Sequence, residues 1–185
     1  HSCIAYIPQR SQVDWNFPVS VADVVMMGRS AKLGPFNWPH KRDWEYVQHA
    51  LETVELSDLA SRQIGQLSGG QQQRMFIARA LSQEAELMLM DEPLSGLDTP
   101  SQEGLLNLLD TLRDQHVTVM VATHDLEQAA RHFDRIMLLN HRIIAFDTPQ
   151  QVLHTDNLLQ AYGGRLKLDS QGTMLVDDCC PPDEQ

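Results

Sequence analysis

The sequence contains few lysines and no long apolar segment. Its three lysines are Lys32, Lys41 and Lys167, and none of them follows a glycine or precedes a serine or threonine. A P-loop needs the pattern G-x-x-x-x-G-K-[ST], whose lysine reaches the β and γ phosphates, so no P-loop is present in these residues. A membrane span needs about 18 apolar residues, and runs such as VTVMVA (117–122) have only the length of a strand.

Cysteine is also scarce, which excludes a disulfide framework. Cys179 and Cys180 are adjacent and could bridge only with strain, and Cys3 stands alone. A reducing cytosol fits this pattern best. No signal peptide is recognisable, and the chain opens on His1 inside an expected strand, so we expect the sequence to be a piece of a longer one.

Basic residues are outnumbered, at 14 against 25 acidic residues, which gives a net charge of −11 and a pI near 5.0. Binding to nucleic acid needs lysine and arginine to displace counterions from phosphates, and a polybasic membrane anchor needs them too. The composition therefore argues against both. The hydrophobic content of 42% is typical of a globular protein.

The apolar periodicity predicts a helical segment from about 20 to 83, followed by alternating strands and helices, which is typical of a parallel α/β sheet. Strands are expected at 3–9, 86–91 and 117–125, a hairpin at 135–146, and helices at 19–30, 43–56, 71–81, 101–115, 126–133, 148–153 and 155–163. The strands at 86–91 and 117–125 are so apolar that we expect both to be buried on both faces. Residues 32–41 are expected to form a loop.

One helix carries a clear apolar stripe. Over 43–56, the residues Trp44, Val47, Leu51 and Val54 fall on one face, and we expect this face to pack in the core. At the other end of the chain, acidic residues and paired prolines predict a flexible tail from Asp177 onward.

Polar residues follow three of the expected strands. Asp91 and Glu92 come directly after four apolar residues, His124 ends the 117–125 strand and Gln9 ends the first strand. Ligands bind at the carboxyl ends of strands in α/β folds, where Asp91 could hold Mg²⁺ and Glu92 could accept a proton from water. A surface Asp-Glu pair and a structural histidine are the plain alternatives.

The segment LSGGQ (67–71) predicts an anion site at a helix start. Ser68 is a favoured N-cap, and Gly69 and Gly70 let a ligand approach the backbone closely. The free N–H groups and the positive end of the helix dipole suit a phosphate. An ordinary capped helix is the alternative.

Together these motifs resemble those of ATP-binding-cassette (ABC) ATPases. LSGGQQQR is similar to the family signature, LMLMDEP to the Walker B strand, SGLD (95–98) to the D-loop, THD to the switch histidine and YIPQ to the Q-loop. The resemblance covers roughly residues 3 to 163. The stretches PQRSQVDWNFPVSVADVVMMGR and LGPF further resemble the cassettes of bacterial manganese, zinc and iron importers.

The resemblance implies ATP and Mg²⁺ as ligands and gives each motif a role. Asp91 and Gln9 would serve Mg²⁺, Glu92 would be the general base and His124 would contact the γ-phosphate.

In the family, two cassettes face each other and trap two ATP molecules. Ser68, Gly69 and Gly70 would therefore clasp the partner's ATP, with Gln71 nearby, and Asp98 would mediate between the two sites.

The implied fold is α/β, a P-loop NTPase-type ABC nucleotide-binding domain truncated at its N-terminus. We expect the end of a core strand and the Q-loop at 1–13, a helical subdomain with the signature at 14–83, further ATPase core at 84–165 and a flexible tail at 166–185. The whole protein would power uptake of Mn²⁺, Zn²⁺ or Fe²⁺ from the cytoplasmic face of a bacterial inner membrane. These residues alone are expected to be inactive as an ATPase.

The expected partners are integral membrane permease subunits, a second ABC ATPase subunit in a homodimer and, indirectly, an extracytoplasmic metal-binding protein, without nucleic acid. The segment from Gln9 to about Arg29 would lie near the groove that receives a coupling helix of the permease. Two alternatives stay open: a non-transport ABC ATPase of DNA repair or the ribosome, and a non-catalytic module that supplies only the signature half-site.

Overall fold

The structure is a computed structural model that describes residues 4–9, 11, 13–33, 37–162, 166–168 and 174–176. The chain forms two compact units, His1–His124 and Asp125–Gln185. Each is described by itself below.

The first unit is built on a parallel sheet of three strands. The strands are β1 (Ile4–Ile7), β2 (Leu87–Asp91) and β3 (Thr118–Ala122), in the order β1-β2-β3. β2 is the central strand, with Leu87 opposite both Ile4 and Thr118. The chain returns from β1 to β2 through a set of helices and from β2 to β3 through one helix, as parallel pairing requires. The expected parallel sheet is confirmed.

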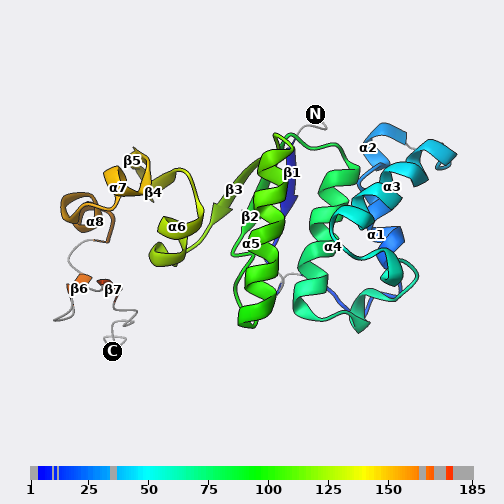
Figure 1. The fold of residues 1–185 in the computed structure, drawn as a ribbon, viewed down its shortest axis with the longest axis horizontal. Coiled ribbons are helices and arrows are strands. Elements are labelled where there is room, and N and C mark those ends of the chain that lie inside the picture. Colours follow the sequence, from blue (N-terminus) through cyan, green and yellow to red (C-terminus); the bar gives the residue numbers. More distant parts are fainter. Residues whose placement is uncertain are drawn as a thin grey trace, which may run out of the picture. The chain divides into compact units, whose positions relative to one another are not determined.

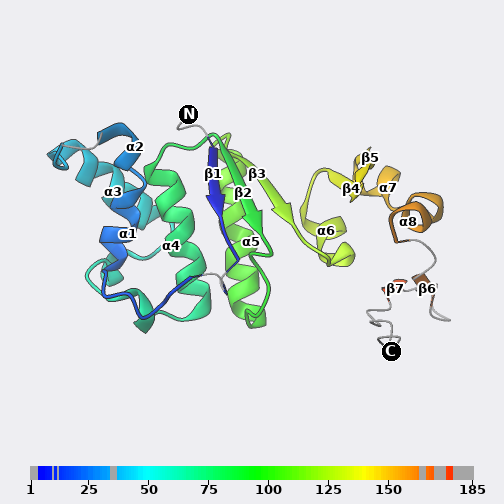
Figure 2. The same ribbon diagram turned by 180° about the vertical axis from the view of Figure 1, so that it is seen from behind.

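The helices of this unit are α1 (Val21–Met27), α2 (Ser30–Leu33), α3 (Lys41–Thr53), α4 (Gly69–Ser82) and α5 (Thr99–Asp114), with short 3₁₀ turns at Ser57–Leu59 and Ile64–Gln66. In Figures 1 and 2, α5 lies against the sheet, α4 lies beside it, and α1 and α3 lie beyond α4. Because α4 contacts α1, α3, α5 and β1, its apolar side chains are almost all buried, among them Met75, Phe76 and Ile77.

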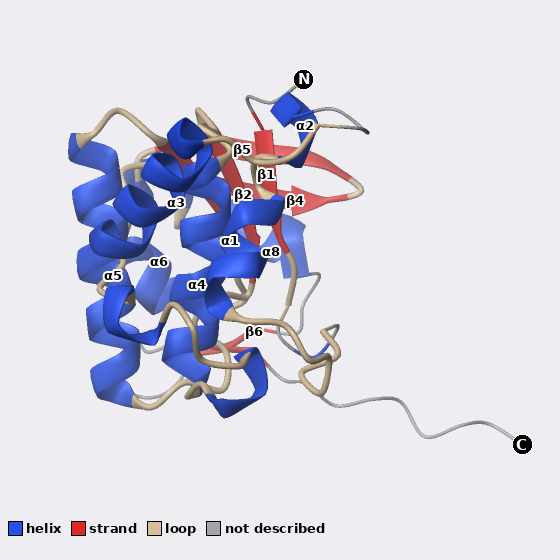
Figure 3. Cartoon of the chain, turned by 90° about the vertical axis from the view of Figure 1, so that its right-hand side faces the viewer, coloured by secondary structure: helices blue, strands red, loops and turns tan. Residues whose placement is uncertain are grey.

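The sheet is covered unevenly. Along β1, Ala5 and Ile7 are buried, whereas Ile4 and Tyr6 are about half exposed, at 48% and 51%. In β3, Met120 is 49% exposed. The prediction of burial on both faces is therefore wrong for β3, whose residues alternate between exposed and half-buried, whereas those of β2 alternate between half-buried and buried. In Figure 3, α5 lies on one side of β1 and β2.

The helix starts follow their capping chemistry. Ser20 caps α1 and exchanges hydrogen bonds with Asp23 in a capping box, and Gly28 ends this helix. Two details differ from expectation. The 32–41 segment is not all loop, since α2 extends to Leu33 and α3 already begins at Lys41. Trp44 is 46% exposed and does not belong to the buried stripe. That stripe consists of Val47 and Leu51 on α3 and of Val54, which directly follows the helix.

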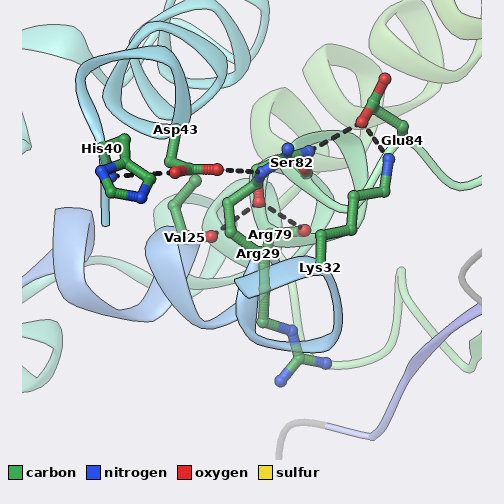
Figure 4. A network of polar contacts seen from close by, with 8 residues as sticks. All are labelled: Val25, Arg29, Lys32, His40, Asp43, Arg79, Ser82 and Glu84. Atoms are coloured by element: carbon green, nitrogen blue, oxygen red, sulfur yellow. Dashed lines mark hydrogen bonds and ion pairs between the residues drawn. The ribbon is translucent and has the colours of Figure 1, made fainter. Parts of the chain in front are cut away.

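A buried arginine joins three helices of this unit (Figure 4). Arg29, 5% exposed, donates to Asp43 on α3 at 3.2 Å, to the Ser82 carbonyl at the end of α4 at 2.9 Å and to Glu84 at 2.8 Å. Lys32 of α2 also bonds Glu84. We call these five residues the Arg29 network. The network fixes the end of α1 and the start of α3 against the end of α4.

The second unit contains α6 (Leu126–His132), β4 (Ile136–Asn140), β5 (Arg142–Asp147), α7 (Pro149–Val152) and α8 (Thr155–Tyr162). β4 and β5 form the expected antiparallel hairpin, with His141 at its turn in a left-handed conformation, φ 54°. The core of the second unit is the cluster Ala129, Ile136, Leu138, Val152 and Leu158.

Two short strands, β6 (Leu166–Leu168) and β7 (Met174–Val176), pair within the segment that was expected to be a flexible tail. The residues from Asp177 onward lie outside the described residues, as do Cys3, Cys179 and Cys180. None of the helices in the described ranges has the length and apolar character that a membrane span requires.

Candidate functional site

The predicted catalytic residues gather at one edge of the sheet. Because β1, β2 and β3 are parallel, their carboxyl ends lie at the same edge. Asp91 is the last residue of β2 and stands opposite Ala122, the last residue of β3. Gln9 comes two residues after β1, and His124 comes two residues after β3. The topology therefore brings residues from three distant segments together.

Glu92 and His124 are in direct contact. The Nδ1 atom of His124 lies 2.9 Å from Oε1 of Glu92, a hydrogen bond between the ends of two neighbouring strands. The glutamate side chain is 30% exposed and the histidine 77%. The imidazole thus remains open on the solvent side, and its ring orientation is set by the carboxylate.

The backbone of Glu92 is strained. Its φ is +44°, in the left-handed region that disfavours a side chain. Its N–H nevertheless donates to the Ala122 carbonyl at 3.0 Å, which continues the β2–β3 ladder, and its carbonyl accepts from Ser95 at 3.1 Å in the following turn. Such strain costs about 1–3 kcal/mol and gathers at functional sites.

The donor atoms at this edge suit a hard cation. Asp91 offers carboxylate oxygens and Gln9 an amide oxygen, which here accepts the Ser11 hydroxyl at 3.1 Å. Mg²⁺ is commonly held by one or two carboxylates, with waters and substrate phosphates completing the octahedron. No cluster of three or more His, Cys, Asp or Glu is found among the described residues, so a protein-only metal cage is not formed by them.

An open cavity of about 350 Å³ lies beside Glu92. It is enclosed by the segment after β1, by α4 and by the turn after β2; the lining residues are Gln9, Ser11, Trp15, Gln73, Glu92, Pro93, Ser95 and Leu97. Sequence reasoning singled out Gln9 and Glu92 but missed Ser11, Gln73 and Ser95. All three lie within motif stretches quoted above, but those motifs do not mark them as neighbours of one cavity, because only the fold brings their segments together.

The LSGGQ segment forms the predicted helix start. Ser68 caps α4: its hydroxyl accepts the N–H of Gln71 at 3.4 Å, and the Gln71 side chain accepts the N–H of Ser68 at 3.0 Å. The N–H of Gln72 is taken by the Ser68 carbonyl. Gly69 and Gly70, as the first two helical residues, have no carbonyl one turn earlier to bond. Their N–H groups are the ones positioned for an anion.

Asp98 caps a second helix next to this start. Its carboxylate accepts the N–H of Ser101 at 3.0 Å, and hydrogen bonds from Ser101 lower the pKa of Asp98 below its usual value. A Cβ on Gly70 would lie 3.0 Å from the side chain of Ser101. The starts of α4 and α5 are therefore packed side by side, and glycine at position 70 permits this approach.

Comparison with known proteins identifies this arrangement. The family described as ABC transporter matches residues 1–95. The chain is 48% identical over 163 residues to the manganese transport system ATP-binding protein MntB of Bacillus subtilis, covering 88% of this chain and 65% of that protein. It is 45% identical over 163 residues to the zinc transport system ATP-binding protein TroB of Treponema pallidum, covering 88% and 61%. The chain thus spans less than two thirds of the length of these relatives.

A solved structure agrees in fold. A metal-chelate type ABC transporter in an inward-facing conformation matches with a TM-score of 0.79 and 32% identity, over 94% of this chain and 70% of that one. The parallel sheet, the predicted motifs at its carboxyl edge and the sequence relatives all agree. The chain belongs to the ABC transporter family.

Proposed function

We propose that this chain is part of the ATP-binding subunit of an ABC importer, in which ATP hydrolysis drives the uptake of a divalent metal cation. The observation that carries the proposal is the pairing of Glu92 with His124 at 2.9 Å at the carboxyl edge of the sheet. A carboxylate and an imidazole held together beside Asp91 suit the hydrolysis of a Mg²⁺-bound triphosphate. Both relatives named above are transport system ATP-binding proteins.

Each residue at the sheet edge has a chemical task in this reaction. Glu92 accepts a proton from the attacking water, and His124, oriented by Glu92, contacts the terminal phosphate. Asp91 and Gln9 hold Mg²⁺, which neutralises charge on the phosphate oxygens when bound. These assignments rest on the geometry and on the donor chemistry of the side chains.

The signature helix serves a different ATP molecule. We propose that Ser68, Gly69 and Gly70 contact the phosphate of an ATP that is bound mainly by a second cassette. Gln71 holds the capping box closed. Asp98, next to this helix start, mediates between the two sites.

The names of the relatives support the proposed cargo. Manganese and zinc are named for MntB and TroB, and Fe²⁺ is the third cation expected from the sequence resemblance. The proposed partners are membrane permease subunits, reached through the segment from Gln9 to about Arg29, and an extracytoplasmic metal-binding protein acts only indirectly. The proposed location is the cytoplasmic face of the membrane. The domain boundaries at 13, 83 and 165 remain a prediction.

The signature half-site can be tested with the chain as it is. Mixed with the complete MntB cassette of B. subtilis, the chain should form an ATP-dependent complex in analytical ultracentrifugation. Gly69→Asp should abolish that complex, because it places a negative charge where the phosphate sits. An acidic residue in the first turn favours the helix itself, so lost binding would not reflect unfolding.

Gly69→Asn is the matched control, because it has the same size without the charge and should keep part of the ATP-dependent binding. ATP-independent association, or equal binding by the Asp and Asn variants, would overturn the signature assignment. Co-purification of a polytopic membrane protein from the native cell supports the importer. Co-purification of ribosomes or DNA instead would favour a non-transport ABC ATPase.

A further inference from the structure

The start of α3 carries the most exposed large apolar side chain of the described residues. Trp38, three residues before the helix, is 85% exposed, whereas the next in order, Leu139, is 67% exposed. An indole left in water forgoes the burial of a large apolar surface. A second tryptophan, Trp44, is the fourth residue of the helix and is 46% exposed. Two tryptophans are therefore presented to the outside within one short segment.

The charges at this helix start are the reverse of what a helix favours. Lys41 and Arg42 are the first two residues of α3, and the N-terminal end of a helix dipole is itself positive. The acidic residue of this turn, Asp43, does not offset them at the surface, because it is 8% exposed and bonds Arg29. Two local preferences of folding are thus broken at the same place, which is typical of functional sites.

Both cations are open to a partner. The Lys41 side chain is 93% exposed, and its Nζ lies 3.9 Å from Glu45 in a surface ion pair that contributes little. Arg42 is exposed as well, with its guanidinium 6.0 Å from the centre of the Tyr46 ring. Residues 37–42 contain no acidic residue, although the whole chain has a net charge of −11. We call Trp38, Lys41, Arg42 and Trp44 the α3 tip.

The α3 tip is separate from the proposed nucleotide sites. Asp43, beside Arg42, bonds Arg29, which bonds the Ser82 carbonyl at the C-terminal end of α4 (Figure 4). Ser68 caps the opposite end of α4, and the 14 residues of that helix span about 21 Å. In Figures 1 and 2, α3 lies beyond α4, away from the sheet. The ATP chemistry proposed above therefore makes no use of the tip.

Exposed tryptophan beside lysine and arginine is the chemistry that recognises the surface of an anionic membrane. The amphipathic indole ring favours the headgroup level of a bilayer, and anionic lipids attract each lysine or arginine near the surface. At 85% exposure, Trp38 stands out from the molecule instead of lining a groove. This suits a flat bilayer better than a protein segment, whose anchoring side chains are usually held in pockets.

We propose that the α3 tip binds the anionic phospholipid headgroups of a membrane. Two cations and two indoles give a weak and reversible contact, since stable anchoring takes stronger signals. This agrees with an overall composition that argues against a polybasic anchor. The tip orients a chain that other partners hold at the membrane. That setting rests on the proposed function, whereas the affinity of the tip for anionic lipid does not.

Sedimentation with lipid vesicles tests the charges of the tip. At about 0.1 M salt, where charges more than about 10 Å apart are largely screened, the chain should bind phosphatidylglycerol vesicles more tightly than phosphatidylcholine vesicles. Lys41→Gln combined with Arg42→Gln should weaken binding to phosphatidylglycerol about 25-fold, or about fivefold for each cation. Equal binding of the wild type to the two kinds of vesicle would overturn the proposal.

Arg62→Gln combined with Arg113→Gln is the matched control. It removes two exposed cations from elsewhere in the first unit and gives the same net charge, so it should keep most of the vesicle binding. An equal loss of binding in the two double variants would overturn the tip as the site. Lost binding in the tip variant would not reflect unfolding, because removing cations from a helix start relieves repulsion by the dipole. Urea titration should show a tip variant at least as stable as the wild type.

Quenching by brominated lipid tests whether Trp38 reaches the bilayer. Bromine on the acyl chains quenches the fluorescence of an indole that enters the lipid. With brominated phosphatidylglycerol, quenching should be largely lost in Trp38→Phe and kept in Trp15→Phe, because Trp15 packs edge-on against Phe76 inside the first unit. Quenching that is lost in Trp15→Phe and kept in Trp38→Phe would place the contact elsewhere and overturn the proposal.

The outcomes are separable from those of the proposed function. The tip lies at the other end of α4 from residues 68–70, so the tip variants should keep the ATP-dependent complex with the MntB cassette. Loss of that complex with vesicle binding retained would overturn the proposed function alone. A folded chain that binds neither kind of vesicle would overturn the lipid contact and favour an acidic protein surface as the partner of the tip.

Discussion

The two ends of α4 differ in how completely their polar groups are paired. At its C-terminal end, the Arg29 network pairs a buried guanidinium with Asp43, Glu84 and the Ser82 carbonyl. Toward its N-terminal end, the first N–H groups are open, the amide of Gln73 has no partner among the described residues, and the neighbouring Glu92 is held in a strained conformation.

This contrast separates stability from function within one helix. The C-terminal end needs nothing from outside the chain, so it can hold α1, α3 and α4 in fixed positions. The N-terminal end leaves its first backbone N–H groups without a partner inside the helix, and these are the groups that we propose contact a phosphate. A ligand gains most from unsatisfied, preorganised groups, whereas a scaffold gains most from satisfied ones.

The largest effect is expected from breaking the Arg29 network. Arg29→Met leaves the Asp43 carboxylate buried without its cation, which should cost about 3 kcal/mol of unfolding free energy. Arg113→Met is the control, because the ion pairs of Arg113 with Asp110 and Asp114 are about half exposed and worth about 1 kcal/mol or less. Urea titration followed by tryptophan fluorescence measures both.

The fluorescence reports on the relevant unit. All three tryptophans, Trp15, Trp38 and Trp44, lie in the first unit. Equal costs for the Arg29 and Arg113 variants would remove the distinction between the two ends of α4, because the network would then behave like a surface ion pair.

The second-largest loss of stability is expected at the close contact between the end of α1 and the end of α4. A Cβ on Gly28 would lie 2.3 Å from both the Arg79 carbonyl oxygen and the Ser82 hydroxyl oxygen. Ser82 also donates to the Val25 carbonyl at 2.6 Å, so the site cannot relax by moving one side chain. Gly28→Ala should therefore destabilise the unit by about 1–3 kcal/mol in the same urea titration.

Gly96→Ala separates packing from backbone strain. Gly96 has a φ of +69° but no atom within 4 Å of an added Cβ, so its substitution tests strain alone and should cost about 1 kcal/mol. A Gly28→Ala variant as stable as the wild type would show that the helices are not tightly fixed there.

Most of the fold could be predicted because its signals are local. Strand and helix periodicity and the serine cap at position 68 depend on neighbouring residues, and they placed the elements within a few residues. The acidic pair after β2 and the histidine after β3 were found for the same reason. Parallel strands bring their carboxyl ends together whatever lies between them.

The failures that concern burial are matters of long-range packing. The apolar runs of β2 and β3 predicted burial on both faces, but hydropathy does not say on which side helices lie. Trp44 fell on the apolar stripe of α3, yet it is about half exposed in the fold. Gln73 was passed over as one of three consecutive glutamines, because its burial depends on segments that are far away in the sequence.

A third and smaller difference in stability should report the backbone strain at Glu92. Glycine adopts positive φ without penalty, whereas alanine has the same backbone restriction as glutamate. Glu92→Gly should therefore be more stable than Glu92→Ala by about 1 kcal/mol, although glycine normally destabilises a folded chain by its entropy. Urea titrations of the two variants give this difference. A more stable alanine variant would show that the backbone of Glu92 is relaxed.

The smallest effect is expected from the exposed side of the Arg29 network, and it depends on pH. Hydrogen bonds from Lys32 and Arg29 lower the pKa of Glu84 from 4.5 to about 2. Because the pKa is lower in the folded state, the stabilisation is present above pH 4.5 and is lost as the pH falls toward 2. Its size should stay below about 1 kcal/mol, since the Glu84 side chain is 41% exposed.

Glu84→Gln isolates this contribution, because glutamine keeps the shape of the side chain and cannot be charged. Urea titrations between pH 6 and pH 3 should show the wild type losing more stability than the variant, so that the two converge toward acid pH. Parallel pH profiles would mean that Glu84 does not stabilise the fold through its charge. The charge of Arg29 would then be balanced mainly by Asp43, which is buried more deeply than Glu84. The exposed Glu84 would add little to the stability of this end of α4.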